Sequence, residues 1–407
     1  MKSRTQRSGS FRKKGTPTSI SNSPSNRRPS GPKTKKSGSV AIDPSNFVQK
    51  AKRSIQLTYE SKRTFSDLPL STAIQRNLKT RGFERPTEIQ DKAIEPILEG
   101  NDLLGIAQTG TGKTGAFLLP ILENLSSHLS PGYALVLVPT RELAIQVQKE
   151  CDDFSKGMGV YCSTFIGGTP INRDLQKLRK KNHIIIGTPG RLLDLMSRGS
   201  LNLSKVHTLV LDEFDRMLDM GFIHDVNTIV KAMPSRKQTM LFSATLDLKQ
   251  ESLIRDLLMN YVTVQISSGT SSSSNVDQDV IKITEGQDKF FVLCNLMKED
   301  EFTKVILFEE TKHRVDRLSK KLNKAGIKSI VIHGNKSQNA RVKALKDFEQ
   351  GRVQILVATD VAARGIDIAD VSHVINYTAP TSMDSYIHRI GRTGRAGKVG
   401  KALTFVA

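Results

Sequence analysis

Residues 103–114, LLGIAQTGTGKT, constrain the fold of this chain more than any other stretch. The first four residues form a short apolar run, which predicts a buried strand. Gly110 and Gly112 allow the backbone to turn tightly, and an apolar helical pattern follows Thr114. A strand, a glycine-rich loop and a helix N-terminus form a phosphate cradle, because free N–H groups and the helix dipole favour an anion. The stretch therefore predicts an α/β domain that binds a phosphorylated ligand.

Two side chains at the end of this stretch are suited to a nucleotide. Lys113 would reach the β- and γ-phosphates, and the Thr114 hydroxyl would ligate Mg²⁺. Ala107 stands where the stricter pattern has glycine. A glycine-rich turn with a solvated lysine is the alternative for these residues alone. Residues elsewhere in the chain are needed to distinguish it from a phosphate-binding loop.

Length and charge limit the possible functions. A chain of 407 residues predicts two or three domains, and its net charge of +21 favours a polyanionic partner over a merely soluble basic surface. Three cysteines without metal-ligand spacing, Cys151, Cys162 and Cys294, are typical of a reducing compartment. No apolar run reaches membrane-spanning length and no signal peptide is seen, so we predict a cytoplasmic protein without a membrane segment, with the nucleus as the alternative.

The first 44 residues differ in composition from the rest. Before Val40 they contain eleven Lys or Arg and no acidic residue, with almost nothing apolar. Such a segment cannot bury enough apolar surface to offset its ordering entropy, so residues 1–44 are predicted to be a disordered basic arm. The arm would hold nucleic acid through phosphate contacts, or serve as a solubilising tail or a nuclear address.

Short β-branched runs alternate with helical stretches after the glycine-rich loop. This alternation predicts a parallel sheet covered by helices on both faces, in which ligands bind at the carboxyl ends of the strands. The runs lie at 134–138, 184–186, 208–211 and 239–242, and one intervening helix is expected at 141–154.

Acidic residues stand where such a site is expected. Asp212 and Glu213 directly follow the run at 208–211. Asp212 would hold the metal, and Glu213 would orient or deprotonate the attacking water. Ser243 and Thr245 follow the next run, where their hydroxyls would bond Asp215 or simply form a turn.

A helix start upstream of the loop offers a base-reading side chain. Pro86 and Thr87 predict the beginning of a helix that carries Gln90 in its first turn. A glutamine amide can pair with adenine as both donor and acceptor, although most glutamines are only solvated.

A second domain is predicted after a flexible linker. Residues 267–275, SSGTSSSSN, have no periodicity, and a flexible chain of this length has ends roughly 15–18 Å apart. We expect a first domain at 45–266 and a second α/β domain at 276–407. Apolar runs in the second part lie at 304–308, 329–332, 354–358, 374–377 and 402–406.

The second domain contributes clustered arginines. Arg389, Arg392 and Arg395 recur at three-residue spacing among glycines. Their mutual repulsion favours an anionic partner, and a γ-phosphate would make them arginine fingers. A solvated basic helix end is the alternative.

From about residue 65 to the end, the chain resembles the DEAD-box RNA helicases of superfamily 2. Many short motifs in the family's order make this resemblance specific, and the second half is most similar to the bacterial RhlE-type branch. The motifs are a Q motif (65 and 82–90), AQTGTGKT (107–114), PTRELA (139–144), GG (167–168), TPGR (188–191), DEFD (212–215), SAT (243–245), ILFEET (306–311), QNAR (338–341), ATDVAARGID (358–367) and HRIGRTGR (388–395).

The resemblance implies two tandem RecA-like domains, each a mostly parallel sheet with helices on both faces, that close over ATP·Mg²⁺ and RNA. It implies ATP hydrolysis coupled to local RNA strand separation or to remodelling of RNA–protein complexes, in a monomer with possible ribosomal or ribonucleoprotein partners. By this resemblance, Phe83 and Gln90 would recognise adenine, with Phe65 packed nearby. Asp367 of the second domain would contact the nucleotide. Phosphate binding falls to the loop residues Ala107, Gln108, Thr109, Gly110, Thr111, Gly112, Lys113 and Thr114, and the γ-phosphate to Arg392 and Arg395. RNA contacts without sequence preference fall to Thr140, Arg141, Gly168, Thr188, Arg191, Arg341 and Thr359.

Two departures from the family pattern leave alternatives open. Phe214 replaces the family's alanine in the DEAD motif, and it would alter the coupling between Asp215 and Ser243. It also supports a rival function, an ATP-dependent RNA clamp with little turnover; a DNA-directed helicase is a third hypothesis. A GTPase is disfavoured because no NKxD segment is present. The family usually continues with a closing helix after the strand at 402–406, so the second domain is expected to be incomplete or to end abruptly.

Overall fold

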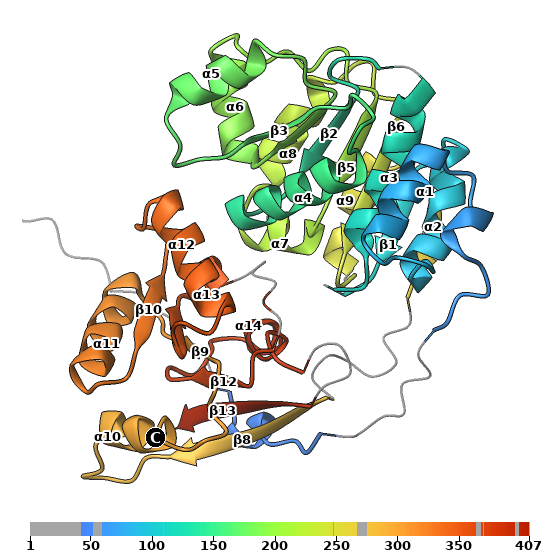
Figure 1. Cartoon of the computed structure of the whole chain (residues 1–407). Helices are drawn as coiled ribbons and strands as arrows, with labels where there is room; N and C mark the ends of the chain where they lie inside the picture. Colours follow the sequence, from blue (N-terminus) through green and yellow to red (C-terminus); the bar gives the residue numbers. More distant parts are fainter. Residues whose placement is uncertain are drawn as a thin grey trace, which may run out of the picture. The chain divides into compact units, whose positions relative to one another are not determined.

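The computed structural model shows two α/β units, each built on one parallel sheet (Figure 1). Their helices and strands follow one another along the chain in alternation, as the sequence predicts. The residues that the structure describes are 42–51, 59–108, 110–127, 129–246, 248–266, 275–363, 368, 370–394 and 399–406.

The first domain contains a seven-stranded sheet in the order β3-β4-β2-β5-β6-β1-β7. Every strand pair is parallel, and β1 lies between β6 and β7. The strands are β1 Leu103–Ile106, β2 Ala134–Leu137, β3 Cys162–Phe165, β4 Ile184–Gly187, β5 Thr208–Leu211, β6 Gln238–Ser243 and β7 Val262–Gln265. The helices are η2 Phe65–Asp67, α1 Thr72–Thr80, α2 Glu88–Leu98, α3 Lys113–Ser127, α4 Arg141–Phe154, α5 Ile171–Leu178, α6 Pro189–Ser197, α7 Phe214–Asp219, α8 Ile223–Lys231 and α9 Leu248–Leu257.

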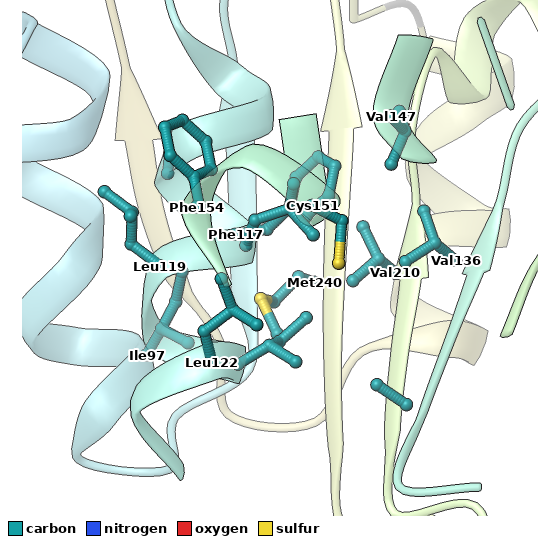
Figure 2. Close-up of a cluster of buried hydrophobic side chains, with 14 of the residues drawn as sticks. Ile97, Phe117, Leu119, Leu122, Val136, Val147, Cys151, Phe154, Val210 and Met240 are labelled. Carbon is teal, nitrogen blue, oxygen red and sulfur yellow. The ribbon is translucent and has the colours of Figure 1, made fainter. Parts of the chain in front are cut away.

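Side chains alternate between the two faces of this sheet. Leu103 belongs to one buried cluster and Leu104 to the other, because successive strand residues point to opposite faces. Figure 2 shows part of the first cluster, in which Phe117 of α3, Cys151 of α4 and Met240 of β6 lie together. Both faces are thus covered, which explains why the central strands are continuous apolar runs.

Helix α4 illustrates why the sequence folds locally as it does. The Thr140 hydroxyl accepts a hydrogen bond from the Leu143 N–H at 3.3 Å and so caps the helix N-terminus. Leu143, Val147 and Cys151 recur every fourth residue and are buried against the sheet. The helix bounds are those predicted from the sequence.

The second domain contains a six-stranded parallel sheet in the order β10-β11-β9-β12-β13-β8. It too has a buried cluster on each face. The strands are β8 Val276–Lys282, β9 Val305–Phe308, β10 Ser329–Ile332, β11 Ile355–Ala358, β12 His373–Asn376 and β13 Gly400–Val406. The helices are α10 Lys289–Leu296, α11 Lys312–Lys324, α12 Gln338–Glu349, α13 Asp360–Ala363 and α14 Met383–Ile390, with the 3₁₀ turn η1 at Pro44–Phe47.

The predicted apolar runs all correspond to strands, but three strands were not predicted. These are β3, β7 and β8, and each lies at an edge of its sheet. Side chains of these three strands are partly exposed, so no continuous apolar run marks them.

Residues 42–51 depart from the domain boundary expected from the sequence. Phe47 is buried in a cluster of the second domain, and Gln49 forms an antiparallel bridge with Gln278 of β8. This short segment, which was assigned to the basic arm and the first domain, therefore packs with the second domain.

Some sequence-based predictions lie outside the described residues. They include most of the basic arm (1–41), the linker core (267–274), Thr109, Asp367 and Arg395. Among the described residues, none of the helices combines the length and apolar character needed to cross a membrane.

Candidate nucleotide and RNA site

The phosphate loop lies between β1 and α3, at the carboxyl end of the first sheet. Gly110 and Gly112 adopt φ values of 85° and 94°, a region that favours glycine. The loop start is tied to the neighbouring strand, since the Ala107 N–H donates to the Ser243 carbonyl at 2.9 Å. Lys113 Nζ donates to the Ala107 carbonyl at 2.9 Å, so the ammonium group lies over the loop. Thr114 is the second residue of α3.

Asp212 and Glu213 follow β5, as predicted, and both are buried. Burial raises the pKa of Asp212 to about 6, although nearby Lys113 opposes this rise. A cation beside such a buried carboxylate stabilises its ionised form. Glu213 adopts φ 53° at the N-cap of α7, an unusual conformation for a non-glycine residue.

Glu213 is held by a residue that the sequence analysis did not single out. Arg216 Nη1 lies 2.5 Å from Glu213 Oε2, one turn along α7. Burial favours the neutral acid, but Arg216 and Lys113 outweigh burial and hold the pKa of Glu213 below its ordinary value. Glu213 is therefore ionised near neutral pH.

Asp215 connects β5 to the end of β6. Its Oδ2 accepts hydrogen bonds from the Ala244 N–H at 3.2 Å and from the Thr245 hydroxyl at 3.4 Å. The Ser243 hydroxyl instead donates to the Thr245 carbonyl at 2.6 Å. Of the two hydroxyls suggested from the sequence, only that of Thr245 bonds Asp215.

The Gln90 amide links the phosphate loop to the start of α2. Its Nε2 donates to the Gly112 carbonyl at 3.0 Å, and its Oε1 accepts from the Thr87 N–H at 3.0 Å. A Cβ on Gly115 would meet Gln90 Nε2 at 2.5 Å. Gln90 is thus fixed between the start of α2 and the loop, with a second Nε2 hydrogen still able to donate.

Aromatic side chains lie at the far end of the same site. Phe83 is 42% exposed and tilted against Phe154, and the Arg81 guanidinium lies 5.1 Å from each ring. Phe65 is buried nearby, and its N–H donates to the Glu84 carbonyl. Arg81 and Phe154 were not identified from the sequence, because their proximity to Phe83 depends on the fold.

One cavity brings the predicted groups of the first domain together. Its volume is about 450 Å³, within the usual range for small-molecule sites. The first-domain residues that line it include Phe65, Phe83, Gln90, Gly110, Gly112, Lys113, Thr114, Asp212 and Glu213.

Arg141 and the glycine pair form a second group of predicted residues. A Cβ on Gly167 would lie 3.1 Å from Arg141 Nη2, and one on Gly168 would overlap the same guanidinium. The glycines therefore leave room for a cation over bare backbone. Burial is the main cause that lowers the pKa of Arg141.

Arg191 has a different environment from the one predicted. Its side chain is 9% exposed and pairs with Asp174 at 3.1 Å. It also donates to the Ile166 carbonyl at 3.1 Å and to the Thr169 carbonyl. Arg191 thus holds the loop that contains Gly168.

The remaining predicted residues lie at helix starts or in the second domain. Thr140 and Thr188 are the N-caps of α4 and α6. Arg341 lies on α12, Thr359 follows β11, and Arg392 follows α14, where its Nε donates to the His388 carbonyl at 3.2 Å.

Phe214 is fully buried in the first domain. It opens α7 and belongs to the cluster that includes Leu211 and Met217. The ring occupies the core, while Asp212 and Glu213 line the cavity.

Two family descriptions match this chain. Residues 87–253 match "DEAD/DEAH box helicase", and residues 288–397 match "Helicase conserved C-terminal domain". The first match covers most of the first α/β domain, and the second covers most of the second.

Curated bacterial relatives are similar over most of the chain. A relative from Streptococcus pneumoniae, named DEAD-box ATP-dependent RNA helicase CshA, is 44% identical over 84% of this chain and 65% of its own length. A CshA from Geobacillus kaustophilus is 44% identical over 84% of this chain and 73% of its own length. The chain therefore spans somewhat less than two thirds of the pneumococcal protein. The RhlE-type branch suggested by the sequence stays a prediction.

Solved structures show the same tandem arrangement of RecA-like folds. A single-substitution variant of Dbp5 from S. cerevisiae, bound to RNA and ADP BeF3, has a TM-score of 0.75 at 32% identity, over 84% of this chain and 89% of that one. Mss116p bound to ssRNA and AMP-PNP has a TM-score of 0.76 at 32% identity, over 85% of this chain and 75% of that one.

Proposed function

Because this chain belongs to the DEAD-box helicase family, we propose that it is an ATP-dependent RNA helicase. One observation carries the proposal: Lys113, Asp212 and Glu213 line a single cavity beside a glycine-rich loop. A cation, a buried carboxylate and an ionised carboxylate at a phosphate cradle are the groups that hydrolysis of a nucleoside triphosphate requires. The relatives with this name support RNA as the partner.

The residues of the site fit a magnesium–nucleotide complex. Gly110 and Gly112 open the loop for phosphate oxygens, and Lys113 is already held over it. Asp212, whose pKa is raised by burial, and the Thr114 hydroxyl would hold the metal. Bound Mg²⁺ would neutralise charge on the phosphates.

Glu213 would orient the water that attacks the γ-phosphate. Because Arg216 and Lys113 keep it ionised, its carboxylate would accept a hydrogen bond from the attacking water and fix the direction of attack. A base of lowered pKa orients water more than it removes a proton. Arg392 and Arg395 of the second domain would stabilise the γ-phosphate charge, and Asp367 would contact the nucleotide.

Adenine would be recognised at the other end of the cavity. The free Nε2 hydrogen of Gln90 would donate to the base, while Phe83 and Arg81 would offer a ring and a guanidinium for stacking. Gln90 also contacts the phosphate loop, so base recognition and loop geometry are linked through one side chain.

RNA would bind through backbone contacts. Arg141 lies over the bare glycine backbone, which allows a phosphate to approach closely. Thr140, Gly168 and Thr188 would complete the surface on the first domain, where Arg191 would act by holding the loop that contains Gly168. Arg341 and Thr359 would contribute from the second domain. ATP and RNA that both prefer closed domains would favour each other's binding.

Further parts of the proposal concern cellular context. We propose RNA as a sequence-independent partner, a monomeric protein, and ribosomal or ribonucleoprotein partners. A cytoplasmic location stays the prediction made from the sequence. The basic arm would add RNA affinity without specificity.

The experiment is ATP hydrolysis with and without single-stranded RNA, using Glu213→Gln as the control. We expect RNA-stimulated turnover that the variant abolishes while it still binds ATP. Tight ATP-dependent RNA binding without turnover would contradict the proposal and favour the clamp. A competition between RNA and DNA of the same sequence separates an RNA helicase from a DNA-directed one.

A further inference from the structure

The segment at residues 42–51 precedes the first domain in the chain but packs against the second. Phe47 is 1% exposed, and its ring centroid lies 4.7 Å from that of Tyr386 on α14. Both rings belong to the buried cluster that contains Val276 and Val374 of the second sheet. Removal of the whole phenylalanine side chain from water stabilises such a contact through the hydrophobic effect.

Backbone pairing fixes the same segment on the edge of the sheet. The Gln49 N–H donates to the Gln278 carbonyl at 3.0 Å, and the Gln278 N–H donates back at 2.8 Å. The Ala51 N–H donates to Asp277 Oδ1 at 2.7 Å. Because β8 is an edge strand, this segment covers part of an edge that would otherwise be open.

The chain is anchored again, on the first domain, a few residues later. Asp91 of α2 is 8% exposed and accepts hydrogen bonds from the Ser61 hydroxyl at 2.7 Å and from Arg63 Nε at 2.8 Å. The Tyr59 hydroxyl donates to the same carboxylate. Arg85, at the nucleotide cavity, donates to the Ser61 carbonyl at 2.6 Å.

We propose that residues 42–51, docked on the second domain, and residues 59–63, docked on the first, act together as an interdomain strap, which links the two domains independently of the linker at 267–275. At one end Phe47 packs into the second domain. At the other end Tyr59, Ser61 and Arg63 bond Asp91 of the first domain. From Ala51 to Tyr59 the chain spans eight residues, which reach at most about 26–29 Å. While both anchors hold, the domains cannot separate further than this length permits at that point.

The strap has a definite consequence for the proposed helicase, and this kinetic part rests on the proposed function. A second tether raises the effective concentration of one domain near the other. A larger closed fraction raises the apparent affinity for a ligand that needs both domains. The strap should therefore lower the RNA concentration needed for stimulation without changing the chemical step.

Docking of the strap is tested first, without any activity measurement. The chain contains no tryptophan, so Phe47→Trp and Val48→Trp each introduce a single emitter. Val48 is the matched control because it is 51% exposed. We expect blue-shifted emission and weak acrylamide quenching at position 47, and solvent-like behaviour at position 48. Solvent-like emission at both positions would overturn the proposal.

A disulfide then tests whether the segment docks on its own chain. In an antiparallel pair that exchanges both hydrogen bonds, the Cα atoms lie about 5.5 Å apart, within the range for disulfides. We expect Gln49→Cys with Gln278→Cys to give a monomeric cross-link when treated with oxidised glutathione, and neither single variant to do so. Covalent dimers would mean that the segment docks on a second copy, and would overturn the strap.

RNA-stimulated hydrolysis tests the consequence. We expect Phe47→Ala to raise the half-saturating RNA concentration about three- to tenfold with kcat unchanged, and Val48→Ala to have no effect. The oxidised double-cysteine protein should keep the half-saturating RNA concentration of the unmodified protein. An unchanged melting transition of the second domain would show that each variant is folded. Identical RNA dependence in Phe47→Ala and Val48→Ala would overturn the kinetic part. Absence of any RNA stimulation would instead count against the proposed function, while fluorescence and cross-linking still report on the strap.

Discussion

Arg216 Nη1 lies 2.5 Å from Glu213 Oε2, and the two side chains are 7% and 8% exposed. A buried carboxylate without a cation would take up a proton, so this pair keeps Glu213 charged in a dry environment. The left-handed backbone of Glu213 directs the chain into α7, which brings Arg216 back one turn later. Strained backbone at such a position is typical of functional sites.

Arg216→Ala should leave Glu213 buried without the cation that bonds it. We expect the first domain to lose about 3–5 kcal/mol of unfolding free energy. Loss of the cation raises the pKa of Glu213, so the acidic limb of the ATPase pH profile should move to higher pH. Arg255→Ala, which breaks an exposed pair with Glu251, is the control and should change little. An unchanged acidic limb with normal folding would contradict the assignment of Glu213.

Gly115→Ala should disturb adenine recognition. Its Cβ would meet Gln90 Nε2 at 2.5 Å and push the amide away from the Gly112 carbonyl. We expect about a tenfold weaker ATP affinity, because one hydrogen-bonded contact of this kind contributes roughly 1–1.5 kcal/mol. Gly190→Ala is the control, since its Cβ would meet nothing within 4 Å. Equal nucleotide affinity in both variants, measured by titration without RNA, would show that Gln90 does not contribute.

Phe214→Ala restores the family's alanine but should destabilise this protein. The ring is fully buried, so its removal should cost about 3–5 kcal/mol of unfolding free energy. We expect no gain in kcat, because Asp212 and Glu213 already line the cavity while the Phe214 ring lies in the core. Phe291→Ala, at a ring that is 62% exposed, should leave the melting temperature nearly unchanged. A large rise in turnover would instead support the clamp hypothesis.

His373 should make the second domain sensitive to acid. It is buried, stacks on Phe302 at 4.0 Å, and faces Glu301 and Lys401. Burial lowers its pKa to about 4, with Lys401 adding to the drop and Glu301 opposing it. Between about pH 6.5 and 4 the unfolded chain binds the proton and the folded chain does not, so stability falls as pH falls, by on the order of 3 kcal/mol in total.

The check is denaturant unfolding of the wild type and His373→Phe at pH 7 and pH 5. Phenylalanine keeps an aromatic ring against Phe302 and cannot titrate. The other ionisable groups are common to both proteins, so the difference between them isolates His373. The variant should lose less stability on acidification; equal losses would contradict the prediction.

The central strands and the phosphate loop could be predicted because their signals are local. Residues 103–106 and 208–211 are buried on both faces, which produces continuous apolar runs. The edge strands β3, β7 and β8 lack that signal: β8 reads VDQDVIK, with only alternate residues near its start buried. Sequence periodicity cannot distinguish such a strand from a polar loop.

Side chains whose roles depend on distant partners could not be predicted. Arg81 becomes part of the adenine end only because the fold places Phe154 beside Phe83. Arg191 looks like a free cation in the sequence, yet the fold buries it against Asp174. Neither relationship leaves a pattern in the local sequence, since the partners lie far along the chain.

The position of β1 between β6 and β7 has a consequence for synthesis of the chain. Leu103 pairs with Met240 and Val262, so the strand that leads into the phosphate loop gains its neighbours only after much of the domain has been translated. Parallel pairs between distant segments form slowly and leave edges exposed meanwhile. A nascent chain on the ribosome therefore carries the loop sequence long before β1 has both of its neighbouring strands, and we expect a nucleotide to stabilise this domain only after β7 has emerged.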